Sequence, residues 1–223
     1  MTQKRGTMKY GESIFDIIYL IYAIAMGVCI LYRRRDTSGR LMGSAILILG
    51  CGDAFHLIPR VLNYFADADF TVWLGAGKLV TSISMTVFYL LMYRLWLVLY
   101  EERKDRKLSI VAYILTAVRI LLCLLPQNGW FQNDSTVLWG IIRNIPFVAL
   151  GGIIIWLFWK RREDVKAFRY VWLLVLLSFL FYIPVAVAAS LVPILGMLML
   201  PKTVCYMLLF WCFLRYASGE NVS

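Results

Sequence analysis

The sequence predicts an all-α fold, that of a polytopic integral membrane protein with seven transmembrane helices. The chain of 223 residues is 61% hydrophobic and 16% charged. Its mean hydropathy is +0.74, far more apolar than a soluble domain of this size needs. A membrane-spanning helix needs about 20 mostly apolar residues. Such stretches lie at approximately 12–33, 41–62, 71–99, 108–126, 136–159, 170–190 and 192–216. We therefore expect residues 1–223 to form a single seven-helix transmembrane domain.

Each stretch has its own support as a helix. The first, 12–33, is too long for a cleaved signal peptide and is followed by three arginines instead of small residues, so we expect it to remain in the protein. In the second and third, small residues such as Gly52 and Gly77 allow neighbouring helices to approach closely. The fourth and fifth are separated by the polar stretches 127–129 and 132–135, which we expect to form an external loop.

Four of the helices are also expected to contain a proline in the same half of the bundle. Proline removes a backbone hydrogen-bond donor and tends to kink a helix. Helices that splay apart at one end leave room for a cavity between them. The residues concerned, in helices two, five, six and seven, are Pro59, Pro146, Pro184 and Pro201.

The distribution of basic residues predicts the orientation of the chain. The loops after the second, fourth and sixth stretches contain no Lys or Arg, whereas the other side collects most of the net charge of +10. Cytoplasmic loops carry the excess of Lys and Arg, so we expect the N-terminus outside, the C-terminus inside, and a multi-pass protein of the cell membrane. The positive charge is then explained by topology and by membrane lipid as a partner, and no nucleic-acid partner is expected. The basic residues on the cytoplasmic side are Arg33, Arg34, Arg35, Arg40, Arg103, Lys104, Arg106, Lys107, Lys160, Arg161, Arg162, Lys166, Arg169 and Arg215.

Five further bases lie inside the apolar stretches, and they are the most informative functional feature. At a rise of about 1.5 Å per residue, all of them fall in the outer half of the bilayer. An ionisable residue within a membrane is costly and marks a functional site by default. Only Asp16 and Asp53 lie at similar depth to balance them. The five bases are Arg60, Lys78, Arg119, Arg143 and Lys202.

Spacing indicates that these groups share a site. Asp53, His56 and Arg60 follow one stripe of a helix at i, i+3 and i+7. We therefore expect an outward-facing cationic pocket that binds an anionic small molecule or lipid headgroup, because guanidinium groups suit phosphate and carboxylate. Such a protein would be a transporter or a receptor. The expected ligand-binding residues are Lys78, Arg143, Lys202, Asp53, His56, Arg60, Arg119, Asp16, Ser82, Asn144 and Tyr182.

Two other interpretations remain open at this point. In the first, the buried charges simply pair with one another. In the second, the protein is an intramembrane lipid-modifying hydrolase in which Asp53 and His56 act as general base and orienting partner beside Ser82 or Thr81. No HxxxH, HExxH or GxSxG motif occurs, which removes the usual hydrolase signatures, so an enzyme is the less favoured prediction. The cysteines form no CxxC pair and the chain has a single histidine, so no metal is expected.

Two families share features with this sequence. The seven helices with an external N-terminus resemble the rhodopsin-type bundle, and the run from Phe179 to Val185 together with Lys202 is similar to helices six and seven of microbial rhodopsins. That resemblance implies a light-driven pump or sensor with retinal bound to Lys202 as a Schiff base. The third helix, however, carries Lys78 and no acid after Asp69, which leaves Asp16 or Asp53 to balance the Schiff base. We therefore expect no cofactor and keep a retinal-binding protein that uses Lys202 as an alternative. The Gly52-Asp53 step also resembles the lysoplasmalogenase family of membrane hydrolases.

Overall fold

The computed structural model describes residues 2–66, 68–100, 106–132, 136–188 and 192–219. These residues form helices only, with no strand in any of the described ranges. Each α-helix contributes a segment that is long and apolar enough to cross a membrane, which confirms the all-α class and the seven transmembrane helices. The α-helices are α1 (Thr2–Arg33), α2 (Thr37–Phe65), α3 (Thr71–Leu99), α4 (Arg106–Leu124), α5 (Val137–Lys160), α6 (Val171–Ala188) and α7 (Met199–Ala217), and the 3-10 helices are η1 (Pro126–Asn128), η2 (Lys166–Phe168) and η3 (Pro193–Leu198).

The helix ends differ from the prediction where a local interaction sets them. Helix α2 begins at Thr37, four residues earlier than expected, because the Asp36 side chain accepts a hydrogen bond from the Gly39 amide at 2.9 Å. Such an N-cap satisfies one of the backbone donors that a helix start leaves free. For the sixth predicted helix, 170–190, the last two residues lie outside the described part of the chain.

The seventh predicted helix, 192–216, corresponds to a membrane-spanning segment at Ile194–Ala217 whose first residues are not α-helical. This segment begins as the 3-10 helix η3, and α-helix starts only at Met199. Pro201 has no N–H to donate to the carbonyl of Met197, so the α-helical bond at that position cannot form. The carbonyl of Met197 instead accepts a bond from the Met199 amide. Pro201 thus falls in the first turn of α7, where proline is tolerated.

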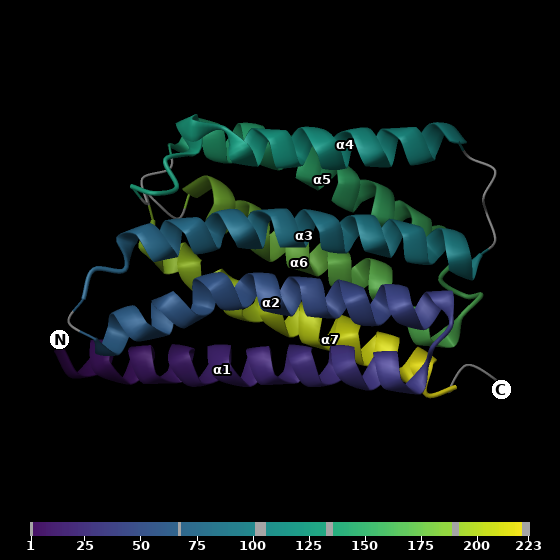
Figure 1. The fold of residues 1–223 in the computed structure, drawn as a ribbon, viewed down its shortest axis with the longest axis horizontal. Helices are drawn as coiled ribbons and strands as arrows, with labels where there is room; N and C mark the ends of the chain where they lie inside the picture. The colour runs from purple at the N-terminus through teal and green to yellow at the C-terminus, as the bar shows by residue number, and fades with distance from the viewer. Residues whose placement is uncertain (1, 67, 101–105, 133–135, 189–191, 220–223) are drawn as a thin grey trace.

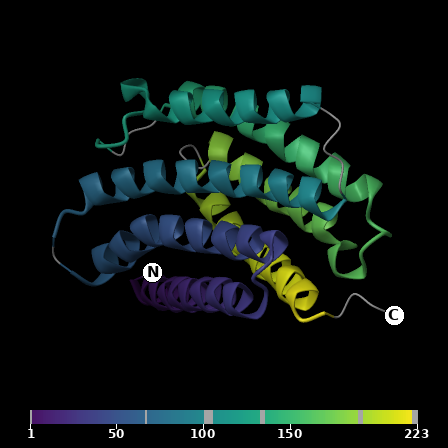
Figure 2. The same ribbon diagram turned by 45° about the vertical axis from the view of Figure 1, so that its right-hand side comes forward.

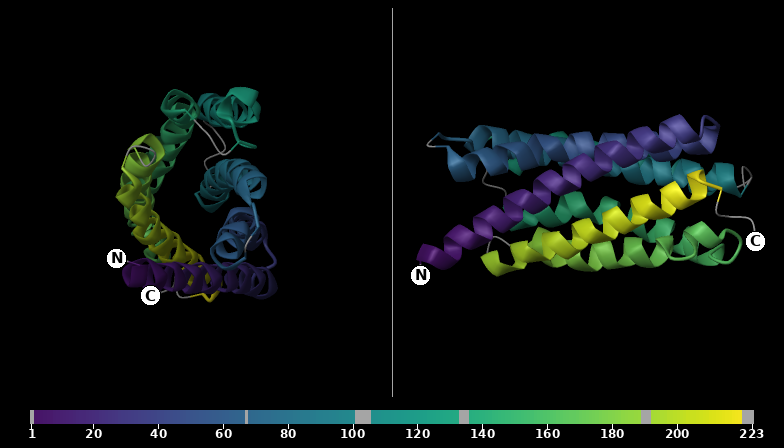
Figure 3. Two further views of the ribbon diagram at one scale, coloured as in Figure 1. Left: turned by 90° about the vertical axis from the view of Figure 1, so that its left-hand side faces the viewer. Right: turned by 90° about the horizontal axis from the view of Figure 1, so that it is seen from below.

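The helices form a closed ring along one long axis. Figures 1 and 2 show α1 to α4 stacked in one layer, with α5, α6 and α7 inclined behind them. Each helix packs on the next in sequence, and α7 returns to α1, while α3 also touches α5. The view along the bundle in Figure 3 shows this ring. Because the number of helices is odd, the two chain ends lie at opposite ends of the bundle (Figure 1). We call them the N-terminal end and the C-terminal end.

Aromatic side chains fill the middle of the ring. Tyr89 of α3 lies at the centre, fully buried, and its hydroxyl oxygen is 3.1 Å from that of Tyr206 and 3.4 Å from Ser178 Oγ. Phe147 and Phe179 pack against the Tyr89 ring with centroids 5.2 and 5.4 Å away. Pairing their hydroxyls lets two tyrosines stay in an apolar core at little cost. This aromatic cluster closes the bundle below the residues discussed next.

Glycines bring α2 and α3 together. A Cβ atom added to Gly77 would lie 2.6 Å from Cα of His56, and one added to Gly52 would overlap the Ser84 side chain. The prediction that small residues permit a close approach here is confirmed. The short separation places the polar residues of α2 and α3 side by side near the N-terminal end.

Candidate functional site

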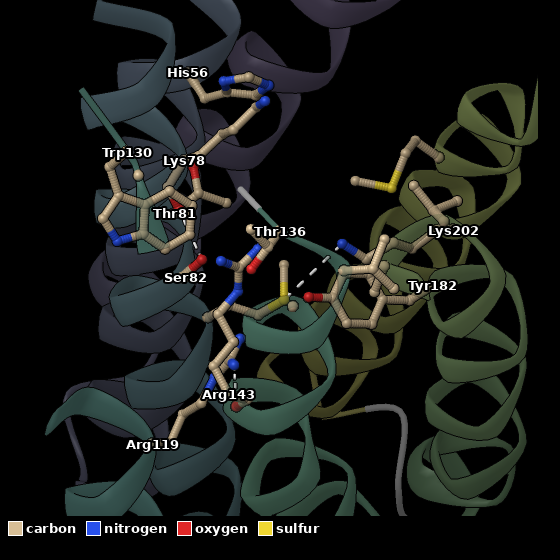
Figure 4. A pocket seen from close by; sticks show the side chains of 17 residues that line it. His56, Lys78, Thr81, Ser82, Arg119, Trp130, Thr136, Arg143, Tyr182 and Lys202 are labelled. Atoms are coloured by element: carbon tan, nitrogen blue, oxygen red, sulfur yellow. Dashed lines mark hydrogen bonds between the residues drawn. The ribbon is translucent and has the colours of Figure 1, made fainter. Parts of the chain in front are cut away.

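A cavity of about 490 Å³ opens within the ring on the N-terminal side of the aromatic cluster. Figure 4 shows its side chains around a common hollow, with Lys78 and His56 on one side, Lys202 and Tyr182 on the opposite side, and Arg119 and Arg143 between them. No Asp or Glu is found among the described residues that line it. We call it the large cavity. It joins four of the five intramembrane bases, which come from α3, α4, α5 and α7.

Lys202 enters the large cavity from the first turn of α7 and is 5% exposed. Its Nζ lies 4.8 Å from the centroid of the Tyr182 ring and 5.4 Å from that of Tyr206. Its hydrogen-bond contact is the thioether sulfur of Met85, at 3.9 Å. Aromatic faces and a thioether only partly replace water around an ammonium group. Within the described ranges no carboxylate forms an ion pair with Lys202, although the charge of Asp53 is close enough to act on it.

Arg119 is the most deeply buried base, at 1% exposure. Its Nη1 donates to the backbone carbonyl of Arg143, and its guanidinium lies over the Phe147 ring, 5.1 Å from the centroid. The Nε donor of Arg119 has no hydrogen-bond partner among the described residues. A buried donor without an acceptor costs about 1–3 kcal/mol, and more when the group is charged. The side chain therefore keeps one donor without an acceptor in the described part of the chain, at an atom that solvent does not reach.

Arg143 is held by the loop after α4. This loop was predicted to be polar and external, and no residue of it was predicted to belong to the site. Asn128 is nevertheless fully buried and Trp130 is 6% exposed. Asn128 Oδ1 accepts a hydrogen bond from Arg143 Nη1 at 2.9 Å, and the Arg143 guanidinium lies 4.3 Å from the Trp130 ring centroid. The Asn128 amide also donates to the carbonyl of Leu122, at 2.7 Å. Asn128 is buried because it satisfies the free carbonyls at the end of α4.

The sequence does contain a feature that could have indicated that this loop folds inward. Trp130 follows a polar run that ends in Gly129, which has a left-handed φ of 59°. A tryptophan after such a turn can fold back onto the bundle, and here its Nε1 donates to the carbonyl of Cys123 at 2.7 Å. Helix α3 makes room for it at Gly75, where any Cβ atom would overlap the backbone of Trp130.

The polar face of α3 runs from Lys78 toward the aromatic cluster. Lys78 and Ser82 both line the large cavity. Ser82 Oγ donates to the carbonyl of Lys78 at 2.8 Å, and Thr81 Oγ1 donates to the carbonyl of Gly52 at 3.1 Å. Both hydroxyls are therefore used as donors to the backbone and keep their lone pairs free to accept.

A smaller cavity of about 70 Å³ lies beside the first, among α1, α2 and α7. Arg60 and Asp16 form an ion pair there, with the Arg60 Nε also 3.1 Å from Asp16 Oδ2. Asp53 Oδ2 accepts a hydrogen bond from the Tyr19 hydroxyl at 2.6 Å. These three charged residues were predicted to belong to the ligand site, and the structure places them around this second space. The two cavities share His56, Thr81, Met199 and Lys202.

Asp53 and His56 have separate partners. The Nδ1 atom of His56 lies 3.3 Å from the carbonyl oxygen of Leu74. Because a carbonyl only accepts, Nδ1 carries the proton and Nε2 is the free ring nitrogen. No hydrogen bond joins Asp53 to His56 in the described ranges. The arrangement positions His56 at the boundary of the two cavities, with its ring held by the Leu74 carbonyl.

Asn144 supports the wall of the large cavity without lining it. The Tyr182 hydroxyl donates to Asn144 Oδ1 at 2.9 Å, and Asn144 Nδ2 donates to the carbonyl of Gly140 at 2.7 Å. This pair fixes the Tyr182 ring beneath Lys202. Asn144, predicted as a ligand residue, therefore lies behind Tyr182 and not in the lining of the large cavity.

The described residues bear on the metal and retinal alternatives as follows. No group of three or more His, Cys, Asp and Glu side chains capable of holding a metal occurs in the described ranges. A retinal chain on Lys202 would have to lie in a cavity whose walls include Lys78, Arg119 and Arg143. An apolar polyene would replace the water around these charges and offer no anion in return.

The fold and its surface define the class of the protein. The seven long apolar helices form a multi-pass membrane protein, and large apolar side chains such as Ile14, Ile21 and Trp211 point outward from the bundle. Comparison with protein-family models, with curated proteins and with solved structures found no match. The part of the rhodopsin-type resemblance that the structure supports is the set of seven helices.

Proposed function

We propose that this chain is a cell-membrane protein that binds an anionic small molecule or lipid headgroup in the large cavity, as a transporter or receptor. The N-terminal end of the bundle faces outward in this proposal, because the C-terminal end carries the basic loops. The observation that carries the proposal is the lining of the large cavity, where bases from four helices meet and no acid is found in the described part.

Two residues support this function most directly. Arg119 and Lys202 are both buried in the large cavity without a carboxylate partner in the described ranges. Bringing such groups into a membrane interior costs several kcal/mol unless an anion or water compensates. Electrostatic repulsion also acts between Arg143 and Arg119 and between Arg143 and Lys78. A bound anion would relieve both penalties.

Of Arg60, Arg119 and Lys202, the self-paired interpretation accounts for Arg60 within the described ranges. Arg60 has its carboxylate in Asp16, as that interpretation requires. The contacts that Arg119 and Lys202 make are with a carbonyl, a thioether and aromatic rings. The hydrolase interpretation gains no observation of its own, since Asp53 binds Tyr19 and His56 binds the Leu74 carbonyl.

Native mass spectrometry of the purified full chain tests the proposal. We expect an anion to co-purify with the wild type and with Lys166→Glu, a charge reversal at the C-terminal end, and to be lost from Lys202→Glu and Arg143→Glu. Lys202→Met, which keeps the length of the side chain, serves if the charge reversal prevents folding. Unchanged occupancy in both cavity variants, or no bound anion together with no thermal stabilisation by added phosphate or carboxylates, would overturn the proposal. Uptake of the identified anion into proteoliposomes then separates a transporter from a receptor.

A further inference from the structure

We infer that Asp53 is a proton-binding site coupled to the large cavity, so that the anion binds together with a proton taken up from water. This inference rests on the proposed function and adds a second bound ion to it. It follows from the place of Lys202 between the two cavities, from the surroundings of the Asp53 carboxylate, and from the room for water beside that carboxylate.

Lys202 lines both cavities, and the two sides differ in charge. On the side of the large cavity its neighbours include further bases, and the described lining contains no acid (Figure 4). On the side of the smaller cavity, Asp53 lines the same space as Lys202, and its charge acts on the ammonium group. Within the described part of the chain, Asp53 is therefore the carboxylate that compensates Lys202 while the large cavity holds no anion.

The ionised form of Asp53 depends on Lys202 for an opposite charge. Its hydrogen bond comes from the neutral hydroxyl of Tyr19, at 2.6 Å. Arg60, the other base of the smaller cavity, is paired with Asp16. The charge of Asp16 acts on Asp53 with the same sign. Asp53 thus has one close donor, a repelling acid nearby, and the Lys202 ammonium as its compensating charge.

An anion bound at Lys202 removes this compensation. It neutralises the ammonium and adds a second negative charge near Asp53, and like charges at short range disfavour the ionised carboxylate. A proton on Asp53 relieves the repulsion, because the carboxyl group becomes neutral and still has an oxygen to accept from Tyr19. The coupling is reciprocal, so a proton on Asp53 also leaves the full charge of Lys202 for the anion.

The smaller cavity has room for the water that would deliver this proton. Its volume of about 70 Å³ exceeds the roughly 10–15 Å³ that one water molecule needs. Thr81 and Thr203 line it with Asp53. Both hydroxyls donate to backbone carbonyls, those of Gly52 and Met199, and so keep lone pairs that can accept from water. The carboxylate therefore borders a space suited to hydration.

The other titratable groups nearby are less suited to take up the proton. A proton on His56 would add a positive charge to a region where Arg60, Lys78 and Lys202 already act on the ring. Asp16 has its own counter-charge in Arg60, so an anion at Lys202 changes its surroundings less. The titratable and charged groups concerned in the described ranges are Asp16 and Tyr19 of α1, His56 and Arg60 of α2, Lys78 of α3 and Lys202 of α7.

Isothermal titration of the purified full chain with benzenesulfonate and with benzoate tests the inference, because both probes keep their charge between pH 6 and 7.5. We expect the wild-type affinity to fall as the pH rises, approaching about tenfold per pH unit for one proton. The heat of binding should also differ between bis-tris and Tris buffers at one pH, since the buffer releases the proton. Binding without either effect would overturn the inference and leave the anion-binding proposal intact. Failure of both probes to bind would overturn both.

The assignment to Asp53 has its own variant. Asp53→Asn keeps an acceptor for Tyr19 and imitates the protonated carboxyl group, so we expect benzenesulfonate to bind at least tenfold more tightly than to the wild type at pH 7.5, with little dependence on pH. A purely structural role of Asp53 predicts equal or weaker binding. Asp164→Asn, which replaces an exposed carboxylate at the C-terminal end, is the matched control and should keep the wild-type pH dependence.

Two further results would contradict the assignment. A folded Asp53→Asn that keeps the wild-type pH dependence would do so, as would loss of that dependence in His56→Gln alone. If Asp53→Asn does not fold, infrared difference spectra of the wild type decide the matter. Binding of benzenesulfonate should then produce the carbonyl stretch of a protonated carboxylic acid, and a wild type that binds the probe without this band would overturn the inference.

Discussion

At the scale of single residues, the bases inside the membrane fall into two groups. Arg60 has a buried carboxylate partner in Asp16, whereas Arg119 and Lys202 are buried with a carbonyl oxygen and a thioether sulfur as their hydrogen-bond acceptors. The sequence shows that bases outnumber acids at this depth, but it cannot show which base receives which acid. That choice depends on α1 and α2 lying side by side, which brings Asp16 and Arg60 together across 44 positions of the chain.

Breaking the Asp16–Arg60 pair should cost stability and not function. Asp16→Leu leaves the Arg60 charge unpaired beside a buried site, and losing one partner of such a pair costs on the order of 3 kcal/mol. We expect a lower melting temperature in detergent for Asp16→Leu, and recovery of most of the loss in Asp16→Leu/Arg60→Met. The double variant removes both charges and serves as the control. Equal melting temperatures for the single variant and the wild type would show that the pair contributes nothing.

At the scale of elements, the contact between α2 and α3 positions one side of the site. Gly77 faces the backbone of His56, and Gly52 faces Ser84. This closeness aligns His56 with Lys78 across the helix pair, as Figure 4 shows. Small residues at these positions were predicted to allow close packing. What they pack against was visible only in the folded bundle, because one face of a helix can meet several neighbours.

Adding a single methyl group tests that contact. Gly77→Ala would force its new Cβ atom within 2.6 Å of Cα of His56, and such overpacking typically costs about 1–3 kcal/mol. We expect a clear fall in melting temperature and weaker anion binding as His56 and Lys78 move apart. Gly152→Ala on α5 is the matched control, since its Cβ atom meets nothing within 4 Å. It should be neutral or slightly stabilising, and an equal loss in both variants would contradict the packing argument.

At the scale of the whole molecule, charge distinguishes the two ends of the bundle. The C-terminal end carries basic loops that also contact the helices. There Arg34 lies over the Tyr216 ring, 4.2 Å from the centroid, and donates to the Tyr216 carbonyl at 3.2 Å. The N-terminal end has the large cavity and, among its loops, residues such as Trp130 that fold inward. The proposal of an outward-facing cavity depends on which end meets the cytoplasm.

Labelling of single cysteines decides the orientation. Gln132→Cys replaces an exposed residue of the loop after α4, and Lys166→Cys replaces an exposed residue of η2 at the opposite end. In intact cells we expect an impermeant maleimide to modify Gln132→Cys and to spare Lys166→Cys until the membrane is permeabilised. The wild type, with its five native cysteines, gives the background. The reverse pattern would place the large cavity on the cytoplasmic side.

The sequence alone determined the number of membrane spans, their approximate limits and the presence of five intramembrane bases. These properties follow from hydropathy, which acts on each segment independently of its neighbours. The sequence also predicted polar residues that line a common cavity in the structure. Their depth in the bilayer could be predicted because it depends only on their position along a helix.

Only the tertiary structure decided which of these residues face one another. It separated Asp16, Asp53 and Arg60 from the large cavity, placed Asn144 behind Tyr182, and drew Asn128 and Trp130 into the wall. It also left the Nε atom of Arg119 without an acceptor. Each outcome depends on how the helices rotate and pack around the ring. The rotation of a helix decides which neighbour a side chain meets, whereas the depth of that side chain in the bilayer follows from its position in the sequence.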